Sequence, residues 1–152
     1  MTHALPWHGS HVLPPRLLLA YRRTRYVAGS VAVAIGERSA AADALLADHA
    51  ARTAVLLTAW NPASRRMPAG WNHRMQQAMA AWLRGRAVVA GEGAWRRWRE
   101  AHLLVIGGVA PMVGLARRFR QHAIVVLARG RPARLVAVTP PARGACATTA
   151  HS

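Results

Sequence analysis

Apolar residues along the chain gather in short runs that are separated by segments with helical spacing. The runs at 53–60, 102–108 and 122–128 are almost continuously apolar, which is typical of strands covered on both faces. The segment 25–36 alternates apolar and small residues, as a strand with one buried face does. A short strand at 86–93 and a hairpin partner at 134–138, after a Gly- and Pro-bearing turn, complete the strand pattern.

Three of the intervening segments have the spacing of amphipathic helices. Ser39 is a suitable N-cap for a helix over 40–51, and Pro111 suits the first turn of a helix that runs to Arg120. The helix predicted at 71–84 places its large apolar residues on one stripe, which fits a core or a dimer face: Trp71, Met75, Ala78, Met79 and Trp82. The pattern predicts an α+β or α/β fold with a mixed sheet of about five strands covered by about three helices.

The chain has 152 residues, which is enough for a single domain with a core of its own. We expect a loosely ordered segment at 1–19, one globular domain at 20–138 and a flexible tail at 139–152. The longest apolar stretch, 103–116, contains four Gly or Pro residues and is too short to span a membrane. Cys146 is the single cysteine, so no disulfide forms within one chain, and we expect a cytoplasmic protein with no membrane partner.

The charge of the chain is unusually one-sided. All 21 basic residues are arginine, only 5 residues are acidic, and the formal net charge is +16. The absence of lysine in an alanine-rich chain indicates that composition drift accounts for part of this excess. A field of this sign attracts phosphates and anionic surfaces whether or not binding them is the function.

The most specific polar cluster lies where the apolar run at 53–60 ends. Thr58, Trp60 and Asn61 stand at this strand end, and Asn72 lies in the first turn of the helix that follows. Ligands of open α/β sheets bind at such ends, and helix N-termini favour anions. The alternative is that Asn61-Pro62 only starts a turn and that Asn72 only caps a helix.

Arginines surround this cluster and suggest what it binds. A guanidinium can donate two hydrogen bonds to one phosphate or carboxylate. Such a contact is predicted for Arg65, Arg66 and Arg74. Tryptophans alternate with arginines in "EGAWRRWRE", a pattern that suits base stacking on Trp95 and Trp98, or else indoles packed in the core under a solvated charged face. The predicted outer phosphate contacts are Arg96, Arg97, Arg117 and Arg118.

Glu100 is the candidate catalytic residue because it precedes a buried strand in a chain with few carboxylates. It is predicted to act as a general acid or base, or alternatively as the ion-pair partner of an arginine. Gln121, which precedes the last buried strand, is the remaining candidate ligand contact. Glu100 and His102 are at most half of a metal site, and no phosphate or dinucleotide motif occurs, so we expect no metal and no cofactor.

Several motifs in order resemble one bacterial family. The segments "AYRRTRYV", "LLTAWNPASRRMPAGWNHRM", "GEGAWRRWREAHLLVIGG" and "LARRFRQHAIVVL" are similar to the family called domain of unknown function 3293, over about residues 20–138. The resemblance places Thr58, Asn61, Pro62, Asn72, Glu100 and Gln121 on motif positions of the family. The resemblance implies a small stand-alone bacterial cytoplasmic domain. It implies no reaction, because no activity is assigned to the family.

These observations lead to three alternatives. The first is a module that binds nucleic acid or another phosphate-bearing ligand in a polar pocket walled by Trp60 and Trp71. The second is a small enzyme in which Glu100 acts as acid or base while Asn61 and Asn72 orient the substrate. The third is a structural or protein-interaction domain. The sequence does not fix the oligomeric state.

Overall fold

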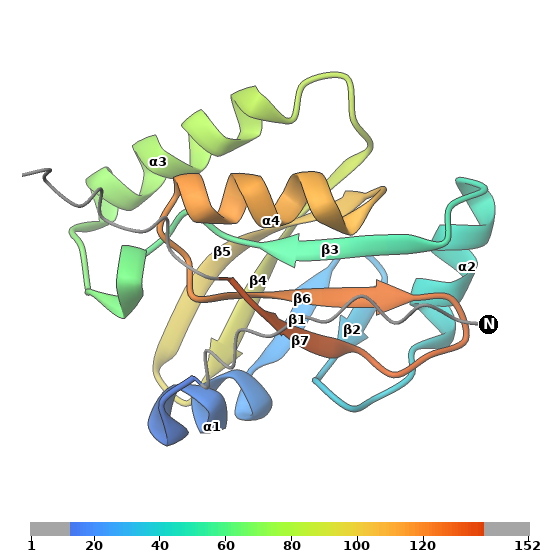
Figure 1. The fold of residues 1–152 in the computed structure, drawn as a ribbon, viewed down its shortest axis with the longest axis horizontal. Helices are drawn as coiled ribbons and strands as arrows, with labels where there is room; N and C mark the ends of the chain where they lie inside the picture. Colours follow the sequence, from blue (N-terminus) through green and yellow to red (C-terminus); the bar gives the residue numbers. More distant parts are fainter. Residues whose placement is uncertain (1–12, 139–152) are drawn as a thin grey trace, which may run out of the picture.

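The computed structural model describes residues 13–138 as four α-helices, one short 3-10 helix and seven strands (Figure 1). The helices are α1 (Pro15–Arg23), α2 (Ala40–Asp48), α3 (Ala69–Trp82) and α4 (Val109–Arg118), and η1 (Pro62–Ser64) is the 3-10 helix. The strands are β1 (Arg25–Ala28), β2 (Val31–Val33), β3 (Thr53–Leu57), β4 (Val88–Trp95), β5 (Trp98–Ile106), β6 (Ala123–Ala128) and β7 (Arg134–Ala137).

All seven strands form one curled sheet in the order β2-β1-β4-β5-β3-β6-β7. Every pairing in it is antiparallel. The fold is therefore α+β, and the predicted mixed sheet of about five strands is wrong in both its strand number and its pairing. The three apolar runs pair with each other through β3, which lies between β5 and β6 at the centre of the sheet, as their burial on both faces requires.

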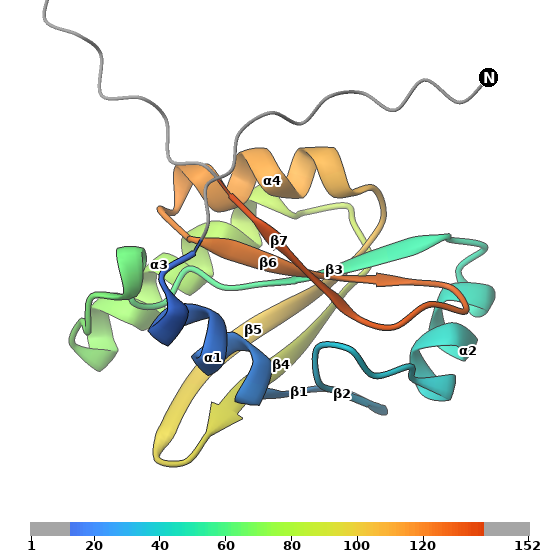
Figure 2. The same ribbon diagram turned by 60° about the horizontal axis from the view of Figure 1, so that its bottom comes forward.

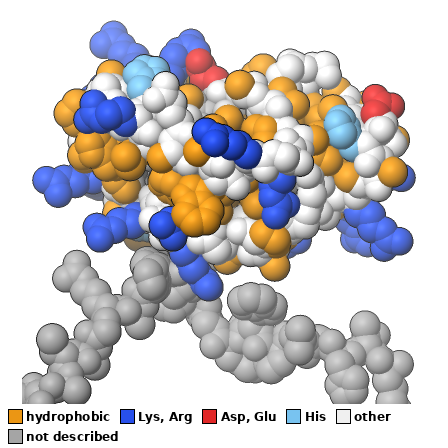
Figure 3. Space-filling view, turned by 90° about the horizontal axis from the view of Figure 1, so that it is seen from above, with side chains coloured by type: hydrophobic (Ala, Val, Ile, Leu, Met, Phe, Trp, Pro, Cys, Tyr) orange, Lys and Arg blue, Asp and Glu red, His pale blue; other side chains and the backbone are white. Residues whose placement is uncertain are grey.

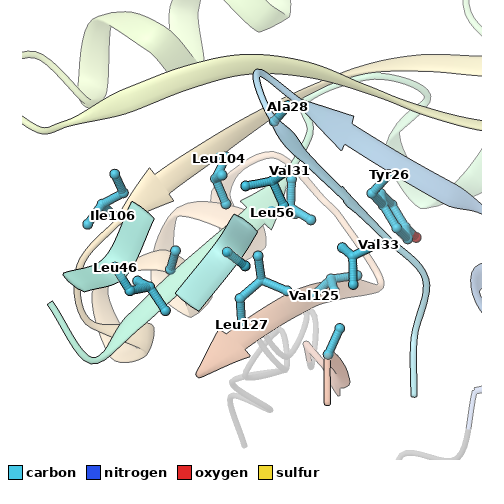
Figure 4. Close-up of a cluster of buried hydrophobic side chains, with 13 residues drawn as sticks. Tyr26, Ala28, Val31, Val33, Leu46, Leu56, Leu104, Ile106, Val125 and Leu127 are labelled. Atoms are coloured by element: carbon cyan, nitrogen blue, oxygen red, sulfur yellow. The ribbon is translucent and has the colours of Figure 1, made fainter. Parts of the chain in front are cut away.

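Two apolar clusters lie on opposite faces of the sheet. On one face α2 packs over a cluster that includes Leu46, Leu56, Leu104 and Val125 (Figure 4). On the other face α3 and α4 supply Met79, Leu83, Met112, Leu115 and Ala116 to a second cluster. The helix α1 lies on the same side as α2, across the strands of the curled sheet (Figure 2).

Two segments of the sheet differ from the sequence prediction because they contain tight turns. The predicted strand 25–36 is the hairpin β1–β2, with Ala28 opposite Val31 and a turn at Gly29, whose φ of 56° suits glycine. The Trp/Arg segment is not helical: Trp95 and Trp98 pair across the tip of the β4–β5 hairpin. No glycine or asparagine marks this second turn, in which Arg96 has a φ of 55°.

Residues 15–19, the last part of the segment 1–19 that was predicted to be loosely ordered, belong to α1. Pro15 is the first residue of the helix, where its missing N–H would have no intrahelical partner in any case. The predicted tail at 139–152 and Cys146 lie outside the described residues. Within the described part of the chain, no helix has the length and apolar character needed to cross a bilayer.

Candidate functional site

A cavity of about 280 Å³ lies between α1 and the curled sheet. Its volume is close to the lower end of the range for small-ligand pockets, about 300–1,000 Å³. The helix α1 contributes Leu17, Ala20 and Tyr21 to the lining, while β3, β5 and β6 contribute mainly apolar side chains from the other side. Of the predicted site residues, the structure brings four together on this lining: Thr58, Asn61, Glu100 and Gln121.

Asn72 lies directly behind the cavity and holds Asn61 in place. The Asn72 Oδ1 atom accepts a hydrogen bond from the Asn61 backbone N–H at 3.0 Å, and its Nδ2 donates to Asn61 Oδ1, also at 3.0 Å. Both asparagines are buried. Asn61 has a left-handed backbone with φ of 46°, which asparagine tolerates better than most residues. The interpretation of Asn72 as a helix cap is not supported, because no side chain caps α3.

These contacts fix the orientation of the Asn61 amide. Its Oδ1 accepts from Asn72 Nδ2 and from the Met67 backbone N–H at 3.0 Å, so its Nδ2 must point away from them. That Nδ2 donates to Glu100 Oε1 at 2.9 Å. The Asn61 amide therefore holds the Oε1 atom of the Glu100 carboxyl in place.

The surroundings of Glu100 make its neutral form more favourable than usual. Burial raises the pKa of the Glu100 carboxyl, and the hydrogen bonds from Asn61 and Trp98 oppose that rise. Among the described residues the ion pairs are Arg25–Glu37 and Arg99–Glu92, so Glu100 is not part of an ion pair there. In a chain so rich in arginine, this acid is surrounded by amides and aromatic rings instead.

Thr58 and two glutamines anchor the strand end at the cavity. The Thr58 hydroxyl donates to the Ala101 carbonyl at 2.6 Å and accepts from the Trp60 backbone N–H at 3.0 Å. The Gln76 side chain accepts from Ala59 N–H at 2.9 Å. The Gln121 amide donates to the carbonyls of Trp60 and Phe119 at 3.1 and 3.2 Å. The segment after β3 is therefore rigidly held although it is not strand.

His102 lies beside Glu100 on the cavity wall. Its Nδ1 is 3.2 Å from the Glu100 carbonyl oxygen, which can only accept, so Nδ1 carries the proton. The ring meets Tyr26 edge-on, with centroids 5.2 Å apart. Burial lowers the pKa of His102 to about 4, so the imidazole is neutral near pH 7.

Four aromatic side chains that were not among the predicted ligand contacts also line the cavity: Tyr21, Tyr26, Trp95 and Trp98. Burial raises the pKa of Tyr21 and of Tyr26, with the nearby Glu100 carboxyl adding to both shifts, so both stay protonated. Trp95 and Trp98 were considered for base stacking or for core packing, and their pairing across the β4–β5 hairpin places them at this cavity instead. The alternation of Glu100 and His102 was a usable signal, because strand residues two apart share a face.

The predicted walls and arginine contacts are not where the sequence placed them. Trp60 and Trp71 do not line the cavity, and Trp60 packs edge-on against His73, with centroids 5.5 Å apart. None of the predicted arginine contacts lines it either: Arg65, Arg66, Arg74, Arg96, Arg97, Arg117 and Arg118. Arginine side chains are scattered around the face seen in Figure 3 rather than gathered in one patch.

Three of these arginines stack on indole rings instead. The Arg66 guanidinium lies 5.8 Å from the Trp98 ring centroid, and that of Arg96 lies 4.8 Å from the Trp95 centroid. Arg118 lies 4.2 Å from the centroid of Trp82, which is 57% exposed and so leaves the predicted apolar stripe of α3. Residues 13–138 contain no group of three or more His, Cys, Asp and Glu that could hold a metal ion.

The family described as "Protein of unknown function (DUF3293)" matches residues 57–124 of the chain. This match supports the family resemblance that the motifs indicate. The matched range contains Thr58, Asn61, Asn72, Glu100 and Gln121, whereas α1 and β1, which also border the cavity, lie before it. No curated protein and no solved structure matches the chain.

Proposed function

We propose that this protein binds a small organic molecule in the cavity beneath α1 and that Glu100 exchanges a proton or a hydrogen bond with it. The supporting observation is the environment of Glu100, a carboxyl in a mainly apolar cavity whose Oε1 atom is held by the Asn61 amide. Carboxyls with a raised pKa in a cleft are typical of acid–base sites. The geometry favours this function over a phosphate pocket, because the cavity lining contains a carboxyl and no arginine.

Benzyl alcohol is a suitable first probe, since it combines an apolar ring with one hydroxyl group. We expect its addition to shift the NMR signals of the Trp95 and Trp98 indole N–H groups, which border the cavity. Ala20→Phe places a ring in the cavity and is expected to abolish the shifts. Leu19→Phe is the matched control, because Leu19 on the same helix is 48% exposed and does not line the cavity. Equal shifts in the Ala20→Phe protein would refute the site.

A second candidate is binding of nucleic acid or another phosphate-bearing ligand on the outer surface. It is supported by the β4–β5 tip, where Arg96 and Arg66 stack on Trp95 and Trp98 and leave guanidinium groups beside indoles. We expect a labelled single-stranded RNA to bind with an affinity that falls steeply with salt. The Arg66→Ala and Arg96→Ala variants should each bind several-fold more weakly, whereas unchanged affinity in both would exclude this tip.

A further inference from the structure

The cavity differs in charge from the rest of the molecule. The chain has a formal net charge of +16, yet the residues that line the cavity include one acid, Glu100, and no arginine. His102 adds no charge near pH 7, because burial lowers its pKa to about 4. The ionisable group that faces a bound molecule is therefore a carboxyl, and an anionic ligand would meet no compensating charge there.

Aromatic rings form much of the remaining wall. Tyr21, Tyr26, Trp95 and Trp98 come from α1, β1 and the β4–β5 hairpin and line the cavity together with Glu100. The faces of such rings attract cations, most strongly where water is excluded. Both indoles already bind a cation in this structure: the Arg96 guanidinium lies 4.8 Å from the Trp95 centroid, and that of Arg66 lies 5.8 Å from the Trp98 centroid. Neither arginine lines the cavity.

Three polar side chains of the lining have used donors within the protein. Thr58 donates to the Ala101 carbonyl, Asn61 donates to Glu100, and the Gln121 amide nitrogen donates to two carbonyls. The Glu100 carboxylate and the Gln121 carbonyl oxygen are acceptors on the same lining. A ligand that supplies N–H donors would satisfy them.

We infer that the cavity selects an organic cation, namely a protonated amine attached to an apolar or aromatic body. This inference rests on the proposed function and names the class of ligand for the same site. The ammonium group contacts Glu100 within the aromatic rings, and the apolar body lies against the α1 side chains Leu17 and Ala20. Charge-assisted hydrogen bonding and cation–π attraction then act on the same group.

The test compares benzylamine with benzyl alcohol at about pH 8, where the amine is protonated and the two molecules have nearly the same shape. Titrations followed by the indole N–H signals are expected to show benzylammonium binding about tenfold more tightly than the alcohol. Glu100→Gln keeps the shape and the acceptor for Asn61 but removes the charge. In this variant we expect the preference for the amine over the alcohol to disappear.

Salt provides an independent check, because the +16 charge repels a cation at long range. Raising the salt concentration should therefore leave the affinity for benzylammonium unchanged or improved, unlike the affinity for a phosphate-bearing ligand. Equal affinities for amine and alcohol in the wild-type protein would overturn the cation class and leave the pocket in place. If neither molecule binds, both this inference and the proposed function fail.

Discussion

Replacing Asn72 by leucine is expected to lower the free energy of unfolding by about 4 kcal/mol, because several buried polar groups lose their partners together. Asn72 accepts from the Asn61 N–H and donates to Asn61 Oδ1 and to the Met67 carbonyl. Leucine has a similar volume but satisfies none of them. Urea unfolding of the two proteins, with the dependence on denaturant compared as well, measures the loss.

The control for this prediction is Gln77→Leu, which makes a similar change of polarity at an exposed position of the same helix. It should alter the free energy of unfolding by no more than about 0.5 kcal/mol. Similar values for both variants would mean that the Asn61–Asn72 pair contributes little. Asn72→Leu also removes the hydrogen bonds that orient the Asn61 amide. The hydrogen bond from Asn61 Nδ2 to Glu100 Oε1 should therefore weaken in the same variant.

His102 is expected to make the protein about 3 kcal/mol less stable at pH 4 than at pH 7.5. Its pKa is near 6.5 in the unfolded chain and about 4 in the fold, so the unfolded state binds the proton first. The stabilisation is complete above pH 6.5 and is lost as the pH falls through about 4. Glu100 acts in the opposite direction, since its raised pKa costs stability as the pH rises above its ordinary value of 4.5.

The contribution of His102 is isolated by the His102→Asn variant, which keeps a side-chain N–H near the position of Nδ1 but does not titrate. The difference in stability between the wild-type protein and this variant should shrink by about 3 kcal/mol between pH 7.5 and pH 4, as measured by urea unfolding at each pH. A difference that is independent of pH would show that His102 keeps its ordinary pKa in the fold.

The parts of the fold that the sequence predicted best are those with strong local patterns. The continuous apolar runs marked the central strands, and Ser39 accepts from Ala42 N–H as the predicted cap of α2. The failures have local causes. A two-residue turn at Gly29 divides an apparently uniform strand, and the arginine turn at Arg96 carries no typical turn residue. Strand order depends on contacts between segments distant in sequence, which no single-sequence pattern contains.

The sequence predicted the polar residues on one wall of the candidate site and missed the aromatic residues on the other. The polar motif after β3 placed Thr58, Asn61 and Gln121 near Glu100, because strand ends and helix starts concentrate polar groups. The other wall was missed, because the helix that carries Tyr21 was not predicted and Trp98 was not expected at the same pocket as Glu100. The arginines carried too much weight in the prediction, because net charge describes the long-range field and not the lining of a cavity.

The helix α1 borders the cavity but lies outside the segment that carries its amide and carboxyl groups. It contains no buried residue and precedes the segment 57–124 that matches the family, whereas the amide and carboxyl groups of the cavity lie within that segment. The chemistry and the shape of the cavity are thus supplied by separate parts of the chain. Substitutions along one face of α1 can change which molecules fit while the Asn72–Asn61–Glu100 arrangement stays intact, so selectivity can be altered without rebuilding the core.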